Sequence, residues 1–210
     1  MFNARTKFLA AGIVAAVGLA AAAQADPISI KFDGTGLGRT VHVTSPTTTR
    51  DLFAGQLKHS YKNADPAIFG QSAGTFVSFC ADISQFVNSN FSVFNTTNAY
   101  GVPMPGGQMM AKGAALEGIF AFAGSHAISS SASPDLAAAF ELAIWEIQHD
   151  YDPTVGVGSL SLSSGNFQAA GAGNTPLSSA IATEFSTLIG HIHDSLSGPQ
   201  TVVGLASSNY

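Results

Sequence analysis

Cysteine, tryptophan and charge are all scarce in this chain. Cys80 is the only cysteine in 210 residues, so no internal disulfide can form. A single thiol in an exported protein is buried and inert, paired with another chain, or chemically used. Charged residues make up only 10% of the chain, while Gly alone occurs 22 times. This composition favours β-structure and polar loops over a compact cytosolic enzyme.

Positive charge is scarce as well, and two of the basic residues lie at the N-terminus. Arg5 and Lys7 precede an apolar run over residues 8–23, and Ala23-Gln24-Ala25 fits the small-x-small rule for signal-peptide cleavage. We therefore expect a signal peptide over residues 1–25 and a periplasmic, cell-surface or extracellular location. A membrane anchor is the alternative, but the run is short for a bilayer span and rich in Ala and Gly.

The mature chain, residues 26–210, keeps 6 of the 8 Lys and Arg residues against 13 Asp and Glu, a net charge of 6 − 13 = −7. This excess of negative charge disfavours nucleic acid as a partner. No apolar run after residue 25 is long enough to cross a membrane, so we expect no membrane span in the mature chain. Its roughly 185 residues are enough for a single domain with a real core.

The order of the predicted elements indicates the fold class. Alternating apolar and polar residues predict strands over 28–32, 39–44, 52–61, 74–83, 91–94 and 201–205. Helical spacing predicts helices over 108–124, 133–150 and 176–196, the last capped by Thr175, with a hairpin or irregular loop over 155–175. Strands followed by helices predict an α+β fold, an antiparallel β-sheet or sandwich with three helices packed on it.

The helix over 133–150 is the element around which the chain is organised. Ser133 is a suitable N-cap, and Pro134 suits the first helical position. Glu141 and Trp145 are four residues apart and are expected at the edge of the apolar face, where a carboxyl beside an indole is partly desolvated. The apolar face itself is predicted to consist of Leu136, Ala139, Phe140, Ala143, Ile144 and Ile147.

Two motifs in these segments resemble a known family. The strand over 74–83 contains Phe79-Cys80-Ala81-Asp82, and the helix contains Ala-Ala-Phe-Glu-Leu-Ala-Ile-Trp-Glu-Ile over 138–147. At this separation they resemble bacterial thioester domains, especially those of exported Gram-negative proteins with a PEP-CTERM sorting tail. The resemblance covers residues 52–205. It implies that Cys80 lies beside residue 141 and that a cysteine thiol is joined to a glutamine side chain there, with loss of ammonia.

The resemblance also implies a function. A thioester shielded from water is an acyl donor, which an amine or hydroxyl on the surface of another protein or a polysaccharide can attack to form a covalent bond. In this chain, however, Glu141 occupies the glutamine position. Closure from a carboxylic acid must expel water, which is unfavourable in water without an activating cofactor, and Gln148 is ~10 Å further along the helix axis.

We therefore expect an exported surface-attachment protein with a thioester-like site at Cys80 and Glu141, neighboured by Asp82 and Trp145. We expect no enzyme activity, cofactor or metal. A non-covalent structural or binding module with an inactive Cys80/Glu141 site is the alternative. PEP-CTERM proteins continue past a final strand into a Pro-Glu-Pro motif, a transmembrane helix and basic residues, none of which occurs before Tyr210. Free secretion and a truncated sequence both stay open.

Structural roles compete with each of these assignments. Cys80 suits a plain core thiol and Trp145 a core anchor. Glu146 and Asp150, four apart, are predicted to form a solvated acidic edge. A protease-like set of Cys80 with His126 or His149 and Asp150 or Asp82 has no local signature around it.

Two further motifs are expected to carry no chemistry. His191 and His193 are two residues apart and diverge on a helix, so they are not expected to bind one metal ion. The glycine-rich stretch 34–38 precedes a strand and not a helix, so it is not predicted to bind phosphate.

Overall fold

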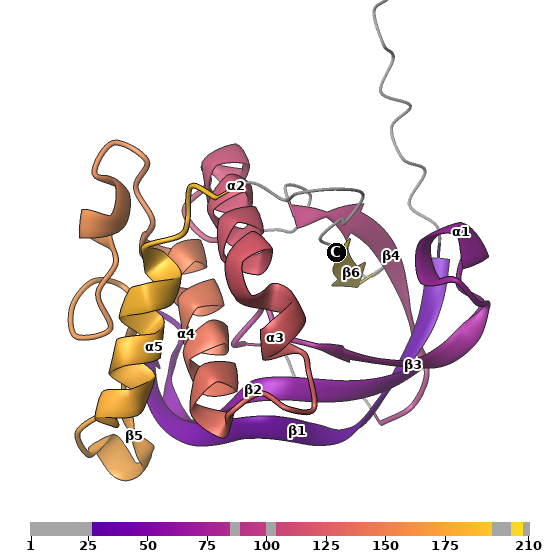
Figure 1. Ribbon diagram of the computed structural model, residues 1–210, viewed down its shortest axis with the longest axis horizontal. Coiled ribbons are helices and arrows are strands. Elements are labelled where there is room, and N and C mark those ends of the chain that lie inside the picture. The colour runs from indigo at the N-terminus through magenta and orange to yellow at the C-terminus, as the bar shows by residue number, and fades with distance from the viewer. Residues whose placement is uncertain (1–26, 85–88, 100–103, 195–202, 208–210) are drawn as a thin grey trace, which may run out of the picture.

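The computed structural model describes residues 27–84, 89–99, 104–194 and 203–207. Six strands form one sheet with antiparallel pairings, in the order β3-β2-β1-β4-β6, and β5 pairs with the far end of β1 (Figure 1). The strands are β1 (Pro27–Ser45), β2 (Thr48–Lys62), β3 (Ala73–Ser78), β4 (Ser92–Asn98), β5 (Gln168–Gly171) and β6 (Val203–Ser207).

The two strands predicted over 28–32 and 39–44 are the two ends of the single long strand β1. Its register with β2 shifts between Phe32 and Gly34 and again near Gly38, which marks β-bulges that bend the strand. At this bend β1 and β2 come very close, since a Cβ on Gly55 would lie 2.3 Å from the Leu37 carbonyl oxygen. The glycine-rich stretch 34–38 therefore lies inside a bent strand, where it allows close backbone contact.

Three helices pack against this sheet: α2 (Met109–Ile119), α4 (Pro134–Asp150) and α5 (Ser179–Ile189). Helix α4 contacts β1 and β2 on one side and α5 and α2 on others (Figure 1). The predicted α+β architecture is confirmed. Shorter pieces connect these elements: α1 (Pro66–Phe69), a π-helical segment (Phe120–Gly124), α3 (Ser125–Ala127) and two 3₁₀ turns (Gly156–Ser159 and Ala172–Asn174). Among the described helices, none has the length and apolar content for a membrane span.

Several predicted boundaries need correction. The helix expected over 108–124 is α2 followed by the π-helical segment, and α3 continues it. Helix α5 begins at Ser179 because the Ser178 hydroxyl accepts from the Ala180 amide, whereas Thr175 exchanges backbone hydrogen bonds with Gly171. The strand expected over 74–83 ends at Ser78, so Cys80 lies beyond β3 and not on a strand.

Helix α4 begins as predicted but is buried differently. The Ser133 hydroxyl accepts from the Leu136 amide at 2.9 Å, and Pro134 occupies the first turn. However, residues 136–148 are all buried, so the helix has no polar solvent face and no exposed edge at Glu141. The sheet, the neighbouring helices and the segment that follows α4 enclose it on every side. Every polar side chain in this stretch therefore requires a partner inside the protein.

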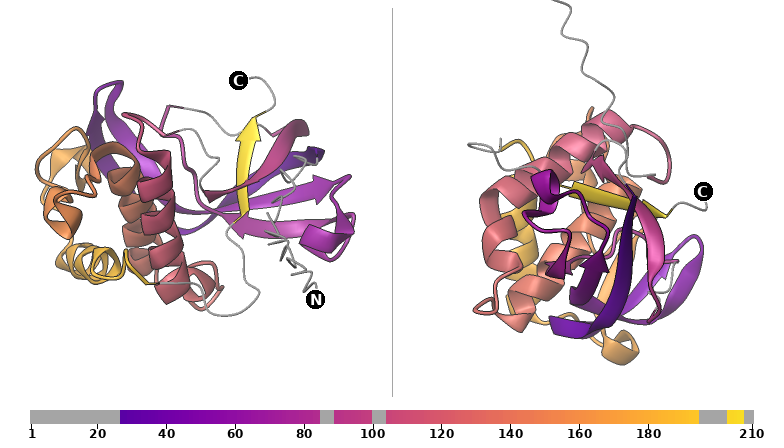
Figure 2. Two further views of the ribbon diagram at one scale, coloured as in Figure 1. Left: turned by 90° about the horizontal axis from the view of Figure 1, so that it is seen from above. Right: turned by 90° about the vertical axis from the view of Figure 1, so that its right-hand side faces the viewer.

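The molecule has two apolar clusters along one sheet. The larger one surrounds α4, and the smaller one contains Ile28, Ile30, Tyr61 and Ala64, with Phe69, Phe76 and Phe94 packed against it. Figure 2 shows that the helices cover one half of the sheet, while β3, β4 and β6 extend beyond them. At that end, the inward-facing residues of β1 and β2 belong to the smaller cluster, and Phe69 of α1 packs against them.

Candidate thioester-like site

Helix α4 holds the Cys80 residue through both of its backbone polar groups. The Cys80 amide donates to Glu141 Oε2 at 3.2 Å, and Trp145 Nε1 donates to the Cys80 carbonyl oxygen at 2.7 Å. Because Glu141 and Trp145 lie one turn apart on α4, they bind the two polar groups of the same residue. The structure thus brings together three of the predicted site residues.

The fourth, Asp82, contacts the thiol through its backbone. The Cys80 thiol donates to the Asp82 carbonyl oxygen at 3.2 Å. The Asp82 carboxylate accepts from the amide and hydroxyl of Ser84 at 2.8 and 2.6 Å, forming an Asx turn. Cys80 and Asp82 therefore do not share one face of a strand, as continuation of the strand expected over 74–83 would require, because the chain turns immediately after β3.

Burial dominates the proton affinity of both groups. Desolvation, followed by the nearby Glu141 charge, raises the pKa of the Cys80 thiol to about 12. Desolvation also raises the pKa of Glu141 well above its ordinary value, against the opposing effect of the hydrogen bond from the Cys80 amide. Glu141 Oε1 is buried and has no hydrogen-bond partner among the described residues. Burial thus favours the protonated, neutral form of both the Cys80 thiol and the Glu141 carboxyl.

Aromatic rings close the site on its apolar side. Phe79, next to Cys80, packs against Phe140 of α4 with ring centroids 4.8 Å apart, and Phe120 meets Phe140 edge-on at 4.9 Å. Trp145 is 2% exposed and packs against Phe167 at 6.0 Å. Glu141 is buried beneath these rings, whereas the Cys80 residue is only half-buried; exclusion of water is the condition that a thioester needs to survive.

The leaving group decides whether Cys80 and the side chain at position 141 can form a thioester. If the Cys80 sulfur attacked the side-chain carbon of a glutamine at position 141, a thioester would form and ammonia would leave. With Glu141 the leaving group is water, and no described residue is placed to activate the carboxyl by phosphoryl or acyl transfer. The described residues thus supply a thiol and a carboxyl whose direct condensation would have to expel water.

The histidines do not complete a catalytic set with Cys80. No hydrogen bond joins Cys80 to His126 or His149 within the described ranges; His149 instead stacks on Phe167, with ring centroids 5.9 Å apart. His191 stacks on Phe122 and shares a 2.7 Å hydrogen bond with Asp194. No group of three His, Cys, Asp or Glu side chains in the described part of the chain could hold a metal ion.

Sequence reasoning missed the burial of Glu146. This residue was expected at a solvated acidic edge, but it is 0% exposed, and Oε1 accepts from the Ser161 amide at 2.6 Å. Burial raises the pKa of Glu146 to about 8, and Glu146 Oε2 has no partner among the described residues. Asp150, one turn on, accepts from the amides of Asn166 and Phe167. Glu146 and Asp150 therefore bind the backbone of the segment that follows α4, over residues 161–167.

Buried Lys112 was also missed. Its ammonium group donates to the Gln148 carbonyl oxygen at 2.6 Å and to the Pro105 carbonyl oxygen at 2.8 Å. The Gln148 carbonyl lies in the last turn of α4, where a positive charge is favourable. A single lysine in an otherwise helical sequence gives no sign of such burial, so no signal in the sequence identifies this contact.

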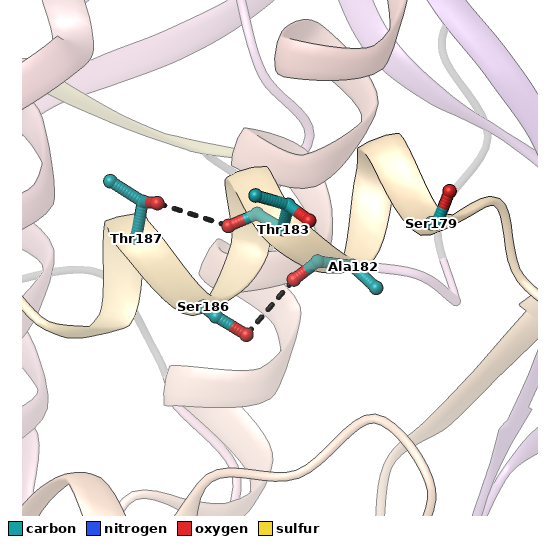
Figure 3. A pocket seen from close by; sticks show the side chains of 5 residues that line it. All are labelled: Ser179, Ala182, Thr183, Ser186 and Thr187. Carbon is teal, nitrogen blue, oxygen red and sulfur yellow. Dashed lines mark hydrogen bonds between the residues drawn. The ribbon is translucent and has the colours of Figure 1, made fainter.

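A hollow on the outer side of α5 is separate from this site. Its volume is about 510 Å³. Figure 3 shows the small side chains that line it. The Ser186 hydroxyl donates to the Ala182 carbonyl oxygen at 2.9 Å and the Thr187 hydroxyl to the Thr183 carbonyl oxygen at 3.0 Å (Figure 3). Because both hydroxyls donate to their own helix, this hollow offers few free donors for a ligand.

Comparison with models of known protein families, with curated proteins and with solved structures finds no match to this chain. The resemblance to thioester domains therefore depends on the motifs around Cys80 and Glu141 alone.

Proposed function

We propose that this protein is an exported surface-attachment module with a thioester-domain-like scaffold, in which the Cys80–Glu141 pair stays unlinked. The observation that carries this proposal is the pairing of the Cys80 amide with Glu141 Oε2, at 3.2 Å. The contact of Glu141 with the Cys80 amide supports a thioester-like arrangement of the pair, and Trp145 binds the carbonyl oxygen of the same cysteine. The partner would be an amine or hydroxyl on a protein or polysaccharide surface.

The raised pKa values favour non-covalent attachment by the protein as it stands. A thiol with a pKa of about 12 holds almost no thiolate near neutral pH, so it is a poor nucleophile. Glu141 has no amide nitrogen to release. A non-covalent binding module that keeps this scaffold is therefore the second candidate, and residue 141 separates it from the first.

Intact mass of the purified protein, with and without methylamine, tests both candidates. We expect wild type to have the mass of its free thiol and free acid, and methylamine to leave it unchanged. Glu141→Gln restores an ammonia leaving group, so its mass should fall by one ammonia, and methylamine should then add to it. Glu141→Gln combined with Cys80→Ser is the matched control and should show neither change.

Two results would contradict the proposal. A wild-type protein lighter by one water and reactive with methylamine would show that Glu141 itself closes the thioester. A Glu141→Gln variant that folds but keeps its ammonia would show that the site is not arranged for thioester formation, and would leave only the second candidate.

A further inference from the structure

The outer face of the sheet, opposite the smaller apolar cluster, carries exposed lysines around an exposed aromatic ring. Because side chains alternate along a strand, the neighbours of inward-facing Ile30 and Tyr61 point outward. The register pairs Ser29 of β1 with both Lys62 of β2 and Val93 of β4, so three strands contribute to one surface. We call this surface the basic sheet face; it consists of Lys31, Lys58, Lys62, Phe91 and Val93.

This face concentrates the available positive charge of an acidic protein. The described ranges contain six Lys and Arg residues, and three of them are on this face. Among the other three, Lys112 is buried, Arg39 bonds to Asp135 at 2.7 Å, and half-buried Arg50 donates to the Ile83 carbonyl oxygen at 3.4 Å. Lys31 is paired with Asp33 at 2.9 Å, whereas Lys58 and Lys62 form no salt bridge within the described residues. The face is therefore locally positive although the mature chain has a net charge of −7.

Two ammonium groups lie within cation–π distance of the aromatic ring. The Lys62 Nζ is 4.2 Å and the Lys31 Nζ 5.7 Å from the centroid of the Phe91 ring. The two charges are thus at most 4.2 + 5.7 = 9.9 Å apart. Like charges held this close favour an anion between or beside them. The Phe91 side chain is 42% exposed and Val93 is 47% exposed, so apolar surface is available at the same place.

We propose that the basic sheet face binds an acidic polysaccharide. A uronic acid chain carries about one carboxylate per sugar, and its sugar rings have an apolar C–H face. Such a ring can pack against the exposed parts of Phe91 and Val93 while its carboxylates pair with Lys62 and Lys58. A membrane surface needs a broader apolar face than one ring and one valine. Duplex nucleic acid carries a much denser charge, about one per 1.7 Å, which the overall negative charge of this protein opposes.

This inference does not rest on the proposed function, because Cys80 and Glu141 lie on the α4 side of the fold and take no part in it. The test is calorimetric titration of the purified protein with polygalacturonate oligosaccharides, with the methyl-esterified oligosaccharide as the uncharged control. We expect binding to the acid form that weakens with added salt, and no binding to the ester. Loss of the thioester-like chemistry would leave this result unchanged.

Single variants locate the site. Lys62→Gln should weaken binding about fivefold, since it removes one exposed charge pair and a ring contact. Phe91→Ser should weaken it further. Arg39→Gln is the matched control, because it removes one exposed positive charge elsewhere and should change affinity by less than about twofold. Circular dichroism checks that each variant keeps its fold.

Several outcomes would overturn the proposal. Equal binding of the acid and ester forms would show that charge plays no part. Equal losses for Lys62→Gln and Arg39→Gln would show that only the net charge matters. Absence of binding at about 0.15 M salt, or tighter binding of oligodeoxythymidylate or of anionic vesicles than of polygalacturonate, would assign the face to another role.

Discussion

The substitution Glu146→Gln should make the protein more stable at neutral pH. In the folded protein the pKa of Glu146 is about 8, against 4.5 for the same group in an unfolded chain. Between these two values the folded state keeps a proton that the unfolded state releases. Stability contributed by this group is therefore fully present below pH 4.5 and is lost as the pH rises towards 8.

The size of the effect follows from the same two values. At pH 7 the unfolded-state carboxyl has been titrated over 7 − 4.5 = 2.5 pH units, while the folded-state carboxyl is still mostly protonated. At about 1.4 kcal/mol per unit this amounts to about 3 kcal/mol. Gln keeps an oxygen that can accept from the Ser161 amide and carries no proton to lose. The variant should thus exceed wild type by about 3 kcal/mol at pH 7 and match it more closely near pH 5.

Urea denaturation at several pH values between 5 and 8.5 measures this difference. Glu141 is present in both proteins, so its own pH dependence cancels in the comparison. Glu184→Gln, which makes the same substitution at a half-exposed position on α5, is the matched control. Parallel curves for Glu146→Gln and wild type would refute the argument, because they would mean that Glu146 titrates alike in the folded and unfolded states.

Three further predictions concern the site and its supports. Iodoacetamide should barely modify Cys80 in the folded protein at pH 7 and should modify it rapidly after unfolding, because its pKa is about 12 only when folded; equal rates by mass spectrometry would contradict this. Trp145→Phe should lower the unfolding free energy by about 2 kcal/mol, since it leaves the Cys80 carbonyl unpaired; an unchanged urea midpoint would count against that hydrogen bond. Gly118→Ala should destabilise more than Gly158→Ala, because its Cβ would lie 2.5 Å from the Ile192 carbonyl carbon, and thermal unfolding compares the two.

The start of α4 and the fold class were predictable because their causes are local. Ser133 and Pro134 define the helix start through contacts within one turn, and the change from strand periodicity to helix periodicity along the chain indicates α+β. By contrast, the sequence does not predict that β1 is one continuous strand. Its bulges interrupt the alternation over residues 33–38, and only the pairing with β2, a non-local interaction, shows that the strand continues.

The residues of the candidate site were likewise predictable only where a local motif marks them. The motifs led to Cys80, Glu141, Asp82 and Trp145, and the structure brings these residues together, although through the backbone of Cys80 and Asp82 more than through a shared strand face. The burial of Glu146 could not be anticipated, because acids four residues apart are typical of an exposed helix surface. The segment that covers Glu146 becomes visible only when residues 152–167 are placed in space.

The two ends of β1 pair with strands from later parts of the chain, β4 at one end and β5 at the other. This determines how late the fold can be completed during synthesis. Residues 41–44 of β1 pair with β2 immediately, through a tight turn, but their other edge waits for β5, with Val41 opposite Gly171, 171 − 41 = 130 residues later. Phe94 of β4 likewise waits for Ser207 of β6, 207 − 94 = 113 residues later. A growing chain therefore carries these unpaired strand edges until residues 203–207 have been made. Slow folding and a need for protection against aggregation follow from this topology.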